Sequence, residues 1–142
     1  MKTWILVANA ARARLFEAEE NDGRLVERAA FEHPEARLHG AELTRDRGGS
    51  VQESASDMRH RIEPRQDPHD KVAVEFAHAL ADMLDQGRID HDFERLILVA
   101  PPRFLGQLRD SLDEQVARLV SESLHKDASR ATAEEIESML HA

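Results

Sequence analysis

The sequence contains no cysteine. A disulfide framework, a cysteine-ligated zinc site and thiol catalysis are therefore excluded, and the absence fits a reducing compartment. No apolar run is long enough to span a membrane, and the apolar run at the amino terminus is too short for a secretory signal and leads straight into Arg12 and Arg14. No internal repeat is evident. We therefore expect a cytoplasmic protein without a membrane partner.

Positive charge is scarce as well, with 19 lysines and arginines against 28 acidic residues and a net charge of −9. A protein that binds nucleic acid over a whole face needs an excess of lysine and arginine over acidic residues, because its cations must displace the counterions of the phosphates. The charge is uneven, however, and between Arg45 and Arg65 five arginines outnumber four acidic residues. The composition thus excludes a broad nucleic-acid surface but allows a local phosphate contact.

The 142 residues suffice for one domain with a buried core, and residues 94–112 predict its centre. The apolar run from Leu96 to Ala100 is typical of a strand buried on both faces of an α/β sheet. Pro101 and Pro102 end that strand because they lack a backbone N–H, and Pro102 suits the first turn of a helix. Apolar residues then follow at helical spacing, namely Phe104, Leu105, Leu108 and Leu112.

Arg103 follows the end of this strand directly. Ligands of open α/β sheets bind at the carboxyl ends of the strands, so Arg103 at the helix start is a candidate anion contact. The alternative is an ordinary solvated arginine.

The remaining patterns complete an α/β fold. Residues 4–8, 12–18 and 24–31 predict an antiparallel meander of three strands, with turns at 9–11 and 21–23. Asp67 as N-cap and Pro68 in the first turn predict a crossover helix that ends at Gly87. Residues 116–126 fit either a strand or a helix. Thr132 and Glu135 form the pattern of a capping box before a last helix, which we expect to cover the sheet.

Residues 98–109, Leu-Val-Ala-Pro-Pro-Arg-Phe-Leu-Gly-Gln-Leu-Arg, resemble the signature of the bacterial host attachment protein family. That family is in turn similar to the middle, peptidyl-tRNA-hydrolysing domain of archaeal and eukaryotic class 1 release factors and of pelota. The resemblance spans nearly the whole chain. It implies a mixed sheet of about five strands related to ribonuclease H, a strand at residues 116–126, and commonly an Asp where this chain has Asn9.

A long loop is predicted at residues 33–66, where no strand or helix pattern occurs. In the release-factor domain the corresponding loop carries Arg-Gly-Gly-Gln, whose glutamine positions water at the peptidyl-tRNA ester. Here Arg47, Gly48 and Gly49 precede Ser50 instead, and Gln52 comes two residues late. Because such catalysis tolerates displacements of only about 1 Å, we expect no peptide release. The two glycines can equally serve as a flexible turn.

The second half of this loop, Arg59-His60-Arg61-Ile62-Glu63-Pro64, resembles the Arg-His-x-x-Glu-Pro element of the host attachment family. An arginine beside a histidine suits a phosphate or carboxylate, and His60 could act as an acid or base near neutral pH. The alternative is a structural anchor that holds the loop by bonds to backbone carbonyls.

The resemblance thus implies a non-catalytic binding domain related to the release-factor core, which would contact the ribosome, transfer RNA or a ribosomal protein through the long loop and Arg103. One alternative is a cytoplasmic protein-interaction module that affects attachment indirectly, and another is a hydrolase using His60. We expect no cofactor and no metal, since His69, Asp70 and His91 do not have ligand spacing. The candidate binding residues are Arg45, Arg47, Gly48, Gly49, Arg59, His60 and Arg103.

Overall fold

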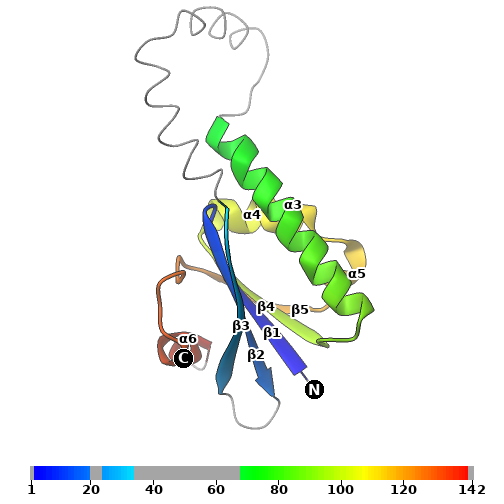
Figure 1. The fold of residues 1–142 in the computed structure, drawn as a ribbon, viewed down its shortest axis with the longest axis vertical. Helices are drawn as coiled ribbons and strands as arrows, with labels where there is room; N and C mark the ends of the chain where they lie inside the picture. The colour runs from blue at the N-terminus through cyan, green and yellow to red at the C-terminus, as the bar shows by residue number, and fades with distance from the viewer. Residues whose placement is uncertain (1, 20–23, 34–67, 141–142) are drawn as a thin grey trace, which may run out of the picture.

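The structure is a computed structural model that describes residues 2–19, 24–33 and 68–140. Five strands form one mixed sheet in the order β3-β2-β1-β4-β5 (Figure 1). β1 pairs antiparallel with β2 and β2 with β3, whereas β1, β4 and β5 run parallel. This confirms the predicted α/β class and the opening meander. The strands are β1 (Lys2–Ala8), β2 (Arg12–Glu19), β3 (Leu25–Glu32), β4 (Arg95–Ala100) and β5 (Val120–His125).

The helices cover both faces of this sheet, and α6 lies on the side opposite to α3 (Figure 1). They are α3 (Pro68–Ile89), α4 (Pro102–Ser111), α5 (Glu114–Ala117) and α6 (Ala133–Leu140). Successive strand residues point to opposite faces, so Leu98 of β4 packs with α3, α4 and α5 while Val99 packs with α6. Both side chains are fully buried, which confirms β4 as the predicted centre of the core.

Gly87 does not end its helix, which is a correction to the sequence analysis. α3 continues to Ile89, and Gly87 is buried within it against the ring of Trp4. A Cβ at this position would lie 2.6 Å from two atoms of that ring. Glycine is needed here because the helix passes close to the tryptophan, and a sequence pattern does not distinguish this requirement from a helix stop.

Residues 116–126 contain both of the structures that their pattern allowed. Val116 belongs to the short helix α5, and the strand implied by the resemblance begins only at Val120. The capping box before α6 is confirmed, because the Glu135 N–H donates to the Thr132 hydroxyl (3.0 Å) and the Thr132 N–H donates to the Glu135 carboxylate (2.7 Å).

Most of the predicted loop at 33–66, together with the predicted N-cap Asp67, lies outside the described residues.

Candidate functional site

Three chain segments meet at one edge of the sheet. Because β1, β4 and β5 are parallel, their carboxyl ends share this edge, and the β1–β2 turn, Pro101 and the segment after β5 follow them. Ligands of open α/β sheets bind at this position. We call it the carboxyl edge.

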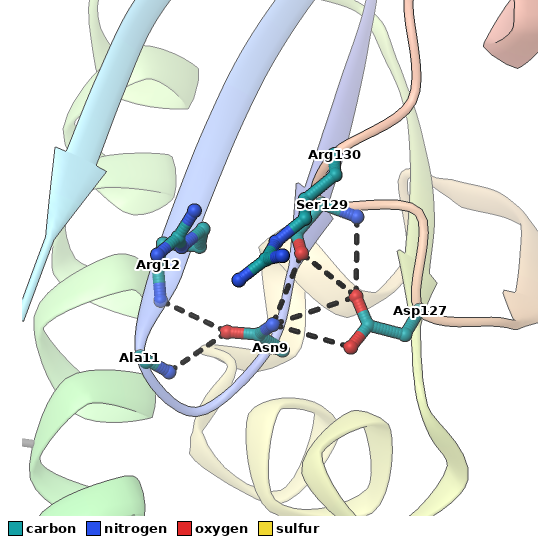
Figure 2. A pocket seen from close by; sticks show the side chains of 6 residues that line it. All are labelled: Asn9, Ala11, Arg12, Asp127, Ser129 and Arg130. Atoms are coloured by element: carbon teal, nitrogen blue, oxygen red, sulfur yellow. Dashed lines mark hydrogen bonds between the residues drawn. The ribbon is translucent and has the colours of Figure 1, made fainter.

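Asn9 joins two of these segments through its side-chain amide (Figure 2). Its Oδ1 accepts from the N–H groups of Ala11 (2.8 Å) and Arg12 (3.0 Å), which fixes the β1–β2 turn in the manner of an Asx turn. Its Nδ2 donates to the Asp127 carboxylate (3.3 Å to Oδ2) and to the Ser129 hydroxyl (3.1 Å). The turn and the segment after β5 are therefore held together across the end of β4.

Asp127 is held in its charged form within this network. Burial works against the charge, but hydrogen bonds from the Ser129 hydroxyl (2.8 Å), the Ser129 N–H (3.1 Å) and Asn9, together with the charge of Arg130, outweigh it. The pKa of Asp127 is consequently lowered from its ordinary value. The Ser129 hydroxyl donates to Asp127 and accepts from Asn9, so its hydrogen-bonding capacity is largely used.

A pocket of about 350 Å³ opens beside this network, and we call it the Arg12–Arg130 pocket. The Arg130 side chain extends from its own segment back toward the β1–β2 turn, on the side where the Arg12 side chain lies (Figure 2). Within the described ranges, no hydrogen bond or ion pair engages either guanidinium group. The lining residues are Asn9, Ala11, Arg12, Asp127, Ser129 and Arg130.

A second pocket of about 390 Å³ lies on the other side of the β1–β2 turn. It contains the predicted anion contact Arg103, which is exposed and forms an ion pair with Asp70 at the start of α3. An exposed pair of this kind contributes little to stability, so Arg103 stays accessible to a stronger partner. The pocket is lined by Asn9, Ala10, Ala11, Asp70, Ala73, Pro101, Arg103, Phe104 and Gln107.

Arg14 fastens the segment after β5 to the sheet. Its guanidinium donates to the backbone carbonyls of Ser129 and Ala131, lies over the ring of Phe16 at 4.9 Å, and forms a double hydrogen bond with Glu27 at 3.0 and 2.9 Å. The hydrogen bond with Glu27 raises the pKa of Arg14 and lowers the pKa of Glu27. Arg14 thereby fixes the backbone on which Ser129 and Arg130 are carried.

Of the predicted binding residues, only Arg103 belongs to the described part of the chain. Arg45, Arg47, Gly48, Gly49, Arg59 and His60 lie outside it and remain predictions. Sequence analysis missed Arg12, Asp127, Ser129 and Arg130. The rule that placed Arg103 at the end of β4 applies equally to the end of β5, but the ambiguous pattern at residues 116–126 concealed that strand.

The described residues contain neither a metal-binding cluster nor a membrane-spanning helix. Those residues contain no group of three or more His, Asp or Glu side chains placed to hold a metal ion. Within the same ranges, no helix combines the length and the apolar character needed to cross a bilayer.

The mixed five-stranded sheet, with its pockets at the carboxyl edge, defines an α/β domain whose architecture suits ligand binding. The chain belongs to the family described as protein required for attachment to host cells, whose model matches residues 4–140. This confirms the resemblance seen at residues 98–109. No curated protein sequence is a significant match to the chain.

The fold is similar to that of an archaeal translation termination factor, with 12% sequence identity and a TM-score of 0.50. A structure described as an archaeal protein gives 10% identity and a TM-score of 0.48. The alignments cover 99% of this chain but 36% of each of those chains. The Ppx/GppA phosphatase of Aquifex aeolicus gives 16% identity and a TM-score of 0.43, with 87% of this chain and 35% of that chain covered. At these identities the likeness shows the fold alone.

Proposed function

We propose that this chain is a non-catalytic binding domain that contacts RNA, on the ribosome or as transfer RNA, through the carboxyl edge of its sheet. The family and the release-factor-like fold fit a binding role. The observation that carries the proposal is the gathering of Arg12, Arg103 and Arg130 around two adjacent pockets in a chain with a net charge of −9. A local cluster of arginines on an acidic molecule favours a limited phosphate contact.

Salt dependence of RNA binding tests this proposal. Purified protein should bind RNA with an affinity that falls as salt is raised, and each lost phosphate contact should lower the slope of log K against log salt by about 1. We expect this reduction for Arg103→Gln. Arg118→Gln is the matched control, because it removes the same charge from the residue that follows α5 and precedes β5, at the opposite end of the sheet.

Affinity capture from the native cell, with and without ribonuclease, separates RNA from the alternatives. Capture of ribosomal components that ribonuclease abolishes supports the proposal. Capture of a protein that survives ribonuclease favours the protein-interaction module, for which the net charge of −9 is the supporting observation. The hydrolase alternative rests on His60, and turnover of an ester that His60→Ala abolishes would establish it.

A further inference from the structure

We propose that the Arg12–Arg130 pocket binds a phosphate group, held between the guanidinium groups of Arg12 and Arg130. This inference deepens the proposed function, on which it rests, by naming the bound group and the two residues that hold it. The two arginines come from different elements, the start of β2 and the segment after β5, and only the folded edge brings them together.

The charge balance of the pocket favours an anion. Two guanidinium groups and one carboxylate, that of Asp127, line it, so its net charge is positive. The Asp127 carboxylate already accepts hydrogen bonds from Asn9 and Ser129 and is held in place by them. Among the described residues neither guanidinium has a hydrogen-bond or ion-pair partner, and the charge of Arg130 acts on Asp127 without such a contact. Figure 2 shows both arginine side chains on the same side of the Asn9 network. Like charges placed together in this way are stabilised by an anion between them.

The number of donors favours phosphate over carboxylate. A guanidinium group binds two oxygens in a fork, and one fork is enough to engage both oxygens of a carboxylate. Two arginines that approach from two segments match the larger number of oxygens and the higher charge of a phosphate. The cavity of about 350 Å³ leaves room for the group to which that phosphate is attached.

The pocket is organised before any ligand arrives. Asn9 fixes the β1–β2 turn that leads to Arg12, and Arg14 holds the carbonyls of Ser129 and Ala131 on either side of Arg130. Binding therefore orders the two arginine side chains and leaves the backbone unchanged, which keeps the entropic cost of binding small.

A titration followed by NMR tests the inference with inorganic phosphate as the probe, at fixed pH and fixed ionic strength set with chloride. We expect the backbone amide resonances of residues 9–12 and 127–130 to shift in a saturable manner. Arg12→Gln and Arg130→Gln should each weaken binding about tenfold or more, because each removes a charge-assisted pair of hydrogen bonds. Arg118→Gln should leave the affinity unchanged. A nucleoside monophosphate and an oligoribonucleotide without terminal phosphates then show whether the bound group is a monoester or a backbone diester.

Several outcomes would overturn the inference: no saturable shift at residues 9–12 and 127–130, equal affinity for acetate, or unchanged affinity in the Arg12→Gln and Arg130→Gln variants. The amide fingerprint spectrum of each variant will show whether it is folded. Loss of binding by a folded variant can then be attributed to the missing guanidinium group. Phosphate binding without RNA binding would leave this inference standing and refute the proposed function. RNA binding that is unaffected by both substitutions would refute the inference and leave the proposed function standing.

Discussion

Asn9 uses the two ends of one amide for two different tasks. The oxygen accepts from the backbone of the β1–β2 turn, and the nitrogen donates to Asp127 and Ser129. A carboxylate can perform the first task but not the second, because it has no hydrogen to donate at neutral pH. The identity of this one side chain therefore decides whether the β1–β2 turn is hydrogen-bonded to Asp127 and Ser129.

We predict that Asn9→Asp will lower the free energy of unfolding at pH 7 by about 1–3 kcal/mol, because it removes the amide donor to Asp127 and Ser129 and places a second negative charge beside Asp127. The difference from the wild type should shrink near pH 4, where one of the two carboxylates takes up a proton. Chemical denaturation at the two pH values measures both effects. A variant as stable as the wild type at pH 7 would show that the Nδ2 bonds contribute nothing.

At the scale of the element, the two glycines in the described helices are expected to respond in opposite directions to replacement by alanine. Gly87 lies in α3 against Trp4, whereas at Gly106 in α4 a Cβ would meet no atom within 4 Å beyond the adjacent residues and the nearby backbone of its own helix. Alanine is normally preferred to glycine within a helix by about 0.5–1 kcal/mol. That preference is available only where the added carbon has space.

We expect Gly106→Ala to raise the free energy of unfolding by about 0.5–1 kcal/mol, through helix propensity alone. Gly87→Ala should lower it by about 1–3 kcal/mol, because a Cβ would lie 2.6 Å from the Trp4 ring and the ring must move. Denaturant unfolding of the two variants side by side measures the contrast. A stabilised Gly87→Ala would mean that α3 and β1 are not in close contact at this point.

Features that depend on residues close together in the sequence could be predicted from it. Features that depend on contacts between residues far apart in the sequence could not. The apolar run of β4 and the capping box of α6 each consist of residues that are close together in the sequence, and both were predicted correctly. The role of Gly87 depends on Trp4, which is 83 positions away in the chain and contacts the glycine only after folding. The Arg12–Arg130 pocket depends in the same way on the register of β1, β4 and β5.

At the scale of the whole molecule, the pair of Arg14 and Glu27 links the fold to pH. Hydrogen bonding to Arg14 lowers the pKa of Glu27, so its ionised form is favoured in the folded state. A carboxyl group with a lowered folded pKa contributes stability above its unfolded pKa, and that contribution is lost as the pH falls through the folded value. Asp127, whose pKa is also lowered, acts in the same direction.

We therefore predict that the wild type loses stability below about pH 4, the ordinary range for carboxyl groups. Glu27→Gln should be less stable than the wild type at pH 7 by about 0.5–1 kcal/mol, because the pair is partly exposed to solvent. The difference should disappear on acidification. Thermal unfolding of both proteins between pH 7 and pH 3 measures it, and a constant difference across this range would contradict the proposed linkage.

The stacking of Trp4 has a consequence for spectroscopy. Trp4 is the single tryptophan in a chain without tyrosine, it is 5% exposed, and its ring lies 4.7 Å from that of Phe93. It stands near the amino end of β1, about 13 Å of strand before the carboxyl edge at Ala8. Intrinsic fluorescence therefore reports the packing of α3 against β1 and is expected not to respond to a ligand at the Arg12–Arg130 pocket. The molecule contains a natural optical probe of its folding that lies apart from the Arg12–Arg130 pocket.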